Sequence, residues 1–237
     1  MGTIGKLPMK LNRMFPKDLT VFQLEMETLA QWVQDNGMSV SLGNHTFPVV
    51  ILSSGNYGTC LKLLNYPGLV LKTCRDRNDG YPAYIRAVTR LKNPRKWMPN
   101  ILAHGGHEAS GMFWCVMPEY DNPTGHQAWG NDSGWFDAGG QDITDACGTG
   151  NLRQRVTLQE DWCSGGMKTV RRKEPKDRKQ RRFFRQVRDF LYPMVQAGAG
   201  VYMHPNNALL DGEQWIITDP IAGWSTDDKE KYEHANS

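Results

Sequence analysis

The chain has 237 residues, of which 39% are hydrophobic and 22% charged, and its formal net charge is +3. This length allows one large domain or two small lobes with a real core, and the composition is that of a globular protein. No apolar run approaches the length of a membrane span, and the first residues lack the apolar core of a signal peptide. The five cysteines include no Cys-x-x-Cys pair, which favours free thiols in a reducing cytosol. The sequence therefore predicts a cytoplasmic protein with no membrane partner.

A helix is predicted over residues 18–37. Asp18 suits its N-cap, and Asn36 followed by Gly37 is a stop signal. Apolar residues recur at helical spacing along one side, namely Phe22, Met26, Leu29 and Val33. This stripe predicts core packing, and we assign residues 1–46 to an N-terminal helical extension without a functional role.

Residues 47–74 predict a three-stranded antiparallel meander. Its strands are expected at Phe47–Leu52, Thr59–Leu64 and Leu69–Lys72. The first loop contains Gly55 and Gly58, which let the backbone approach phosphate groups, although a hairpin turn explains both glycines equally well. Because lysine is rarely buried unless it is paired, Lys72 is expected to have an anionic partner.

A second helix is predicted over residues 81–92, with Pro82 in its first turn. Its apolar face consists of Tyr84, Ile85, Val88 and Leu91. No Asp or Glu occurs between Gly80 and His107.

Two further strands are expected over residues 101–106 and 112–117, and residues 116–121 are typical of a linker. His104 and His107 are interpreted as ordinary strand or turn histidines, since residues three apart on a strand point to opposite faces.

Residues 122–182 show no clear period, which predicts a long irregular insert that is functional or loosely ordered. Its tryptophans suit a partner surface or a small satellite core. Residues 168–188 hold eleven Lys or Arg and two acidic residues, a local charge of +9 that leaves −6 for the rest of the chain. Such a run forms solvated surface or contacts nucleic acid or an acidic protein.

A helix is expected to follow near Phe183, and Pro193 should kink it or shift its end. Its apolar face consists of Phe184, Val187, Leu191 and Val195.

Residues 201–220 predict a β-hairpin, because two apolar runs flank Asp211-Gly212, a pair that tolerates positive φ. The hairpin would bring Asn207 and Asp219 together at one end of two paired strands. A carboxamide and a carboxylate so placed suit Mg²⁺ bound with phosphates, whereas solvated side chains on a surface hairpin explain them as well.

The order of these features resembles the protein-kinase fold across residues 47–220. Residues 52–58 are similar to the glycine-rich loop, Val70-Leu71-Lys72 to the lysine strand, and Met117–Tyr120 to the hinge. The polar loop Tyr202–Asn207, which enters the hairpin, is similar to the Asp-x-x-x-x-Asn of the catalytic loop, and Asp219 after the hairpin is similar to the metal-binding Asp of Asp-Phe-Gly.

Residues of the loop and the hairpin also resemble the early serine/threonine protein kinases of short-tailed lytic phages, which act in host takeover. They are Met203-His204, Asn207, Ile217-Thr218-Asp219-Pro220 and Trp224.

The resemblance implies an α+β, protein-kinase-like two-lobed fold with an antiparallel β N-lobe and a reduced, truncated helical C-lobe. It implies ATP and Mg²⁺ as cofactors, host proteins as partners and the host cell cytoplasm as location. The residues it assigns are Gly55, Gly58, Lys72, Pro118 and Tyr120 for the nucleotide, Asn207 and Asp219 for the metal, and Tyr202 and His204 for catalysis. The domains it assigns after the extension are residues 47–121 as N-lobe and hinge, 122–182 as the insert and 183–237 as the reduced C-lobe.

The sequence departs from the family at the catalytic aspartate, whose position is occupied by Tyr202. A phenol, with an ordinary pKa of about 10, is a poor base at neutral pH. The helix over residues 81–92 also offers no Glu to pair with Lys72. Two functions therefore stay open. One is an ATP-dependent serine/threonine kinase with His204 as a substitute base, and the other is a pseudokinase that blocks or redirects a host protein.

Overall fold

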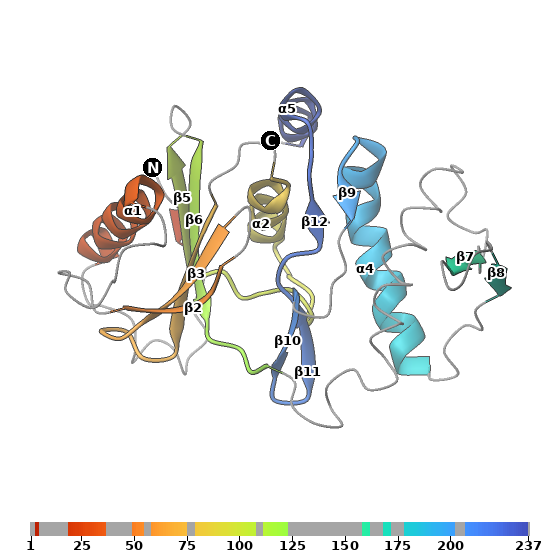
Figure 1. The fold of residues 1–237 in the computed structure, drawn as a ribbon, viewed down its shortest axis with the longest axis horizontal. Helices are drawn as coiled ribbons and strands as arrows, with labels where there is room; N and C mark the ends of the chain where they lie inside the picture. The colour runs from red at the N-terminus through yellow and green to blue at the C-terminus, as the bar shows by residue number, and fades with distance from the viewer. Residues whose placement is uncertain are drawn as a thin grey trace. The chain divides into compact units, whose positions relative to one another are not determined.

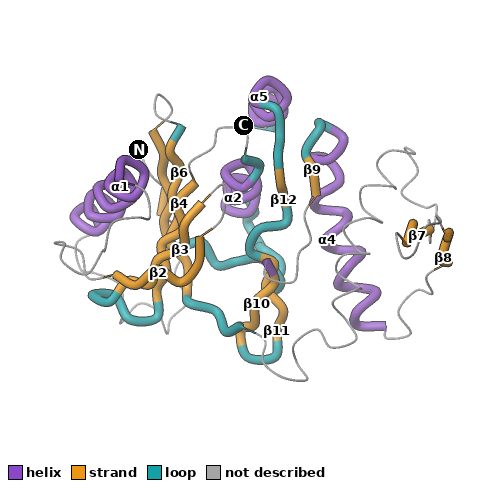
Figure 2. Tube along the Cα trace, in the orientation of Figure 1, coloured by secondary structure: helices purple, strands orange, loops and turns teal. Residues whose placement is uncertain are grey.

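The computed structural model describes residues 3–4, 19–36, 49–54, 58–74, 79–107, 111–122, 158–161, 168–171, 178–201 and 207–236. The chain divides into two compact units, Met1–Asp121 and Asn122–Ser237. Both units contain helices and antiparallel strands (Figure 1 and Figure 2), which confirms the predicted α+β class.

The first unit is built on one antiparallel sheet with the strand order β1-β5-β6-β4-β3-β2. Its strands are β1 (Thr3–Ile4), β2 (Val49–Ser54), β3 (Gly58–Leu63), β4 (Leu69–Cys74), β5 (Ala103–His107) and β6 (Met112–Pro118). The predicted meander and the two later strands are confirmed. β1 is not predicted by the sequence, because two residues are too few to show a period.

Alternation along the central strands gives the sheet two covered faces. On β4, Leu69 and Leu71 are fully buried against helix α1 (Leu19–Asn36), while Val70 and Lys72 lie on the opposite face. The residues that α1 adds to this core include the predicted stripe and are Phe22, Met26, Leu29, Ala30 and Val33. The stripe therefore packs in the core as predicted, and α1 forms one layer of the first unit.

Helix α2 (Tyr81–Arg90) covers the other face of the sheet (Figure 1). Pro82 lies in its first turn, where the missing N–H costs no hydrogen bond. The apolar face is buried as predicted except at Leu91, which is 37% exposed. The helix ends at Arg90, and Leu91 is its extended C-cap, so it no longer follows the helical face.

Within its described residues, the second unit contains helices α4 (Arg178–Gln196) and α5 (Thr226–Ala235) and three two-stranded antiparallel ladders. The ladders pair β7 (Leu158–Asp161) with β8 (Lys168–Arg171), β9 (Gly200–Val201) with β12 (Ile221–Ala222), and β10 (Ala208–Asp211) with β11 (Gln214–Ile217).

Three features of the second unit differ from expectation. Helix α4 begins at Arg178, ahead of Phe183, because the end of the basic run is itself helical, and it continues past Pro193. Strands β7 and β8 lie inside the stretch expected to be irregular. The hairpin turn is centred on Gly212-Glu213, with Gly212 at a φ of 62°, since Asp211 is already paired within the hairpin.

Helix α5 begins after the N-cap residue Ser225, a signal that the sequence prediction did not use. The Ser225 hydroxyl accepts a hydrogen bond from the Asp228 N–H at 3.3 Å and donates to the Asp228 carboxylate at 2.7 Å. The hydrogen bond from Ser225, followed by the one from Lys231, holds the pKa of Asp228 below its ordinary value. Among the helices in the described ranges, none is long and apolar enough to cross a membrane.

The packing of α1 predicts a contrast between two of its leucines. Leu29 is 1% exposed in the core, whereas Leu24 is 65% exposed on the outer side. Leu29→Ala should lower the free energy of unfolding by about 2–5 kcal/mol, because it leaves a cavity. Leu24→Ala should change it by less than about 0.5 kcal/mol. Urea denaturation measures both values, and equal losses would show that α1 does not pack on the sheet.

Candidate functional site

Lys72 lies on β4, in the interior of the sheet. Its cross-strand neighbours are Cys60 on β3 and Cys115 on β6, and the residue is partly buried. The Nζ atom lies 3.8 Å from the centroid of the Tyr81 ring, which is a cation–π geometry. Tyr81 is the first residue of α2, a helix without Asp or Glu. One partner of the ammonium is thus an aromatic ring, where the sequence predicts an anion.

Cys60 faces the same side of the sheet as Lys72, because the two residues are directly opposite each other on neighbouring strands. Burial raises the pKa of the Cys60 thiol, and Lys72 offsets part of this rise. The thiol is therefore protonated at neutral pH and slow to alkylate, since the thiolate is the reactive form.

Of the two glycines predicted to contact the nucleotide, the structure describes Gly58 alone. Gly55 lies outside the described residues. Gly58 begins β3, and a side chain there would collide with the carbonyl oxygen of Thr73 on β4. Glycine at position 58 is therefore explained by the close approach of two strands. The register of β2 against β3 also shifts at Leu52, which is a bulge just before the loop.

The linker after β6 uses its polar groups within the first unit. The Glu119 N–H donates to the Gly68 carbonyl oxygen at 2.8 Å. The Tyr120 hydroxyl accepts a hydrogen bond from the Asn100 N–H at 2.8 Å. Pro118 has no N–H to donate. At positions 118 and 119, this linker would therefore contact a nucleotide base through carbonyl oxygens and not through N–H groups.

In the second unit, the hairpin of β10 and β11 places Asn207 and Asp219 at its open end. The Asn207 carbonyl oxygen accepts a hydrogen bond from the Thr218 N–H at 2.7 Å and from the Thr218 hydroxyl at 3.0 Å. Asp219 follows Thr218 directly. The register thus brings the two predicted metal ligands to one end of the hairpin.

A second ladder flanks the hairpin on both sides in the chain. β9 and β12 pair Val201 with Ile221, while the hairpin joins Asn207 to Thr218. Asp219 lies between these two connections. The predicted catalytic positions, Tyr202 and His204, lie outside the described residues.

The turn at the end of α4 determines where this ladder begins. Gly198 has a φ of 94°, and the N–H groups of Gly198 and Ala199 donate back to the last turn of α4 in a Schellman motif. The buried Trp224, which follows β12, donates from Nε1 to the Ala197 carbonyl oxygen at 2.9 Å. Both strands of the ladder are therefore anchored to the end of α4.

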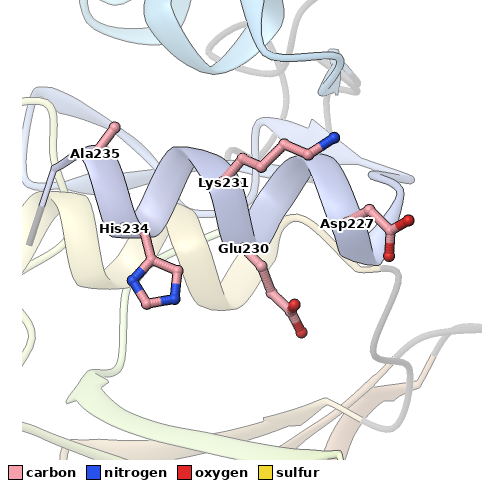
Figure 3. Close-up of a pocket in the computed structure, with 5 residues that line it drawn as sticks. All are labelled: Asp227, Glu230, Lys231, His234 and Ala235. Atoms are coloured by element: carbon pink, nitrogen blue, oxygen red, sulfur yellow. The ribbon is translucent and has the colours of Figure 1, made fainter.

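An open depression on α5 is lined by Asp227, Glu230, Lys231, His234 and Ala235. Glu230 and His234 point to one side of the helix and Lys231 to the other (Figure 3). Within the described part of the chain, no group of three or more His, Cys, Asp or Glu side chains is placed to hold a metal ion. The depression therefore gives no sign of a metal centre.

The predicted site residues are divided between the two units. Lys72, Pro118 and Tyr120 belong to the first unit, and Asn207 and Asp219 belong to the second. A single site that uses all of them stays a prediction. Sequence reasoning missed Tyr81, which precedes Pro82 at a helix start and has only the pattern of a core residue.

No protein-family model matches the sequence, and the comparison with curated proteins gives no match. Among solved structures, the chain is similar to a thermostable mutant of the aminoglycoside phosphotransferase APH(4)-Ia in its apo form. The TM-score is 0.28 and the sequence identity 16%, and the similarity covers 82% of this chain and 72% of that chain. A likeness this weak assigns neither family nor activity.

Thr218 provides a test of how firmly the open end of the hairpin is held. Thr218→Val keeps the shape but removes the hydroxyl that donates to Asn207, and should lower the free energy of unfolding by about 0.5–1.5 kcal/mol. Thr218→Ser keeps the donor and should retain this contribution. If urea denaturation shows a loss for Thr218→Ser but none for Thr218→Val, the methyl group and not the hydrogen bond stabilises this end.

Proposed function

We propose that the chain is a protein-kinase-like protein that binds Mg-ATP, with Lys72 on the phosphates and Asn207 and Asp219 on Mg²⁺. The observation that supports the proposal is the pair of ladders, in which Asp219 lies between the pairing of Val201 with Ile221 and the hydrogen bond from Thr218 to Asn207. In protein kinases, an Asn of the catalytic loop and the Asp of Asp-Phe-Gly hold the metal ions.

The donor set fits this role. Mg²⁺ prefers oxygen ligands and binds through one or two carboxylates together with substrate phosphates. Asp219 supplies a carboxylate. The backbone carbonyl of Asn207 accepts two hydrogen bonds from Thr218, and its side-chain carboxamide is the oxygen ligand that we propose for the metal.

The first unit supports the proposal through the order of its elements. The sequence between β2 and β4 begins with Gly55 and Gly58, Lys72 lies on β4, and helix α2 follows. Protein kinases have the same order, in which the glycine-rich loop covers the phosphates and the strand lysine contacts them. Because Cys60 lies opposite Lys72, it would be close to a nucleotide bound there.

The resemblance of the polar loop to early phage kinases supports a more specific proposal. The γ-phosphoryl group would pass from ATP to a Ser or Thr hydroxyl of a host protein in the host cytoplasm. ADP would leave, and the hydroxyl proton would go to a base. His204 is the residue proposed as this base, because the Tyr202 phenol is a weak one at neutral pH.

The second candidate function is a pseudokinase that binds the nucleotide and blocks a host protein. Tyr202 in the position of the catalytic aspartate favours it. Phosphoryl transfer depends mainly on positioning and charge neutralisation, so the loss of the aspartate slows the reaction without abolishing the site. The two candidates share nucleotide binding and differ only in turnover.

Nucleotide binding should raise the melting temperature of the protein, because a ligand specific to the native state stabilises it. At 100 times Kd the gain is about 2.7 kcal/mol. Asp219→Ala should remove most of this shift. Asp211→Ala, at the exposed far end of the same hairpin, should leave it intact. If Mg-ATP does not change the melting temperature of the wild-type protein, the proposal is contradicted.

Two further readouts locate the nucleotide and separate the two candidates. Mg-ATP should slow the alkylation of Cys60 by iodoacetamide if the phosphates lie at Lys72. Transfer of labelled phosphate that survives Tyr202→Phe but is lost in Asp219→Ala would support the kinase. A retained melting shift without any transfer would support the pseudokinase.

The arginines of α4 support a further proposal, binding to the phosphate backbone of nucleic acid. Arg178, Arg182 and Arg185 recur at helical spacing, and the helix has no acid before Asp189. The opposite side of α4 is buried at Val187, Leu191 and Met194. Arg182 and Arg185 are exposed, so the basic run continues onto the helix as an outward-facing stripe.

Salt dependence measures this contact, because bound cations are released when arginines neutralise phosphates. Replacing both Arg182 and Arg185 by Gln should reduce the slope of log K against log salt by about 1–2 for a duplex DNA probe. Replacing the exposed Arg90 and Lys92 by Gln provides a charge-matched control that should keep the slope. Binding that ignores salt would contradict the proposal, and binding to an acidic peptide alone would assign the stripe to a protein partner.

A further inference from the structure

The face of the sheet that carries Lys72 meets α2 through aromatic rings. The Lys72 Nζ atom lies 3.8 Å from the ring centroid of Tyr81, and the Arg86 guanidinium carbon lies 5.4 Å from the ring centroid of Phe113. A cation of the sheet thus meets a ring of the helix, and a cation of the helix meets a ring of the sheet. Since α2 has no acidic residue, the helix offers Lys72 no carboxylate.

The Tyr81 ring is fixed in orientation. Its backbone N–H donates to the carboxylate of the buried Asp79 at 3.0 Å, and its hydroxyl lies 2.9 Å from the Cys115 sulfur. The ring also meets Phe113 edge to face, with 6.2 Å between centroids. Tyr81 is fully buried, so its face is presented to Lys72 in one orientation.

We propose that Tyr81 is the positioning residue for the Lys72 ammonium. In protein kinases a Glu of the helix after the lysine strand does this by forming an ion pair. Here the negative face of a buried ring attracts the ammonium in its place. The role of Lys72 toward phosphate rests on the proposed function, but the contact between ring and ammonium does not.

Positioning by a ring has a different consequence from positioning by a carboxylate. A carboxylate would cancel the ammonium charge and compete with phosphate oxygens for its protons. A ring has no net charge, so its contact with Lys72 does not cancel the positive charge of the ammonium. The contact is also part of the core between β4 and α2, and it is therefore present before any ligand binds.

Fluorinated rings test the contact without changing the shape of the core. Fluorine withdraws charge from the ring face and weakens its attraction for a cation. The variants are Tyr81→Phe and then phenylalanines with one, two and three ring fluorines at position 81. The measured quantity is the rate at which an N-hydroxysuccinimide ester acylates Lys72 without nucleotide, relative to Lys62, whose ammonium is bonded to Glu119.

We expect the Lys72 rate to rise stepwise with fluorination, because acylation consumes the neutral amine and the ring favours the ammonium. The total rise should be about 3- to 30-fold, the range of a cation–π contact. Tyr81→Phe itself should change the rate by less than about 2-fold. A rate that does not depend on fluorination would overturn the proposal. So would a full rise in Tyr81→Phe alone, which would assign the effect to the hydroxyl and Cys115.

The same variants separate this inference from the proposed function. The shift of melting temperature caused by Mg-ATP should shrink as fluorines are added, when each variant is compared with its own melting temperature without nucleotide. If the wild-type protein shows no shift, the nucleotide proposal fails, and the acylation series still decides whether Tyr81 positions Lys72.

Discussion

Strand β4 is covered by a helix on each face, and the rest of the first unit depends on this constraint. Alternation directs Leu69 and Leu71 toward α1 and directs Val70 and Lys72 toward α2. The α1 side is formed mainly by apolar side chains, which are stabilised by packing, although Thr59 and Thr73 are also buried on this face. The α2 side must accommodate an ammonium, and a buried charge without a partner is costly. The residue at the start of α2, Tyr81, therefore determines the environment of the Lys72 ammonium.

Two lysines on neighbouring strands of the sheet have different kinds of partner. Lys62 bonds to Glu119 at 2.8 Å, and the two side chains are 38% and 29% exposed. Solvent screens such a pair, which contributes little to stability. Lys72 lies on the more central strand β4, where the Tyr81 ring contacts its ammonium. The ring attracts the ammonium without removing its charge, which explains how a helix without acids can stabilise a lysine.

Local patterns predicted most of the elements, because α1, α2, the meander and the hairpin each have a period or a turn signal of their own. The hairpin turn was misplaced by one residue because Asp211-Gly212 and Gly212-Glu213 both give glycine a positive φ. The start of α4 was missed because its first turn is basic and shows no apolar period. β1, β9 and β12 have two residues each, and each forms only by pairing with a strand that is distant in the sequence.

Tyr81 was missed for a similar reason. Its proposed role depends on contact with Lys72 on β4, and no sequence pattern links these two elements. The predicted roles of Gly55, Tyr202 and His204 remain predictions, because these residues lie outside the described ranges.

The position of Asp219 follows from more than the hairpin that contains it. A two-stranded hairpin is marginal by itself, and a ladder of two residues per strand is weaker still. The ladder of β9 and β12 is held because Gly198 turns the chain at the end of α4 and Trp224 bonds to that same end. Asp219 lies between this ladder and the bond from Thr218 to Asn207, so both of its flanks are fixed. The backbone at Asp219 is thus positioned by the end of a helix more than twenty residues earlier in the chain, which no local pattern around Asp219 could have indicated.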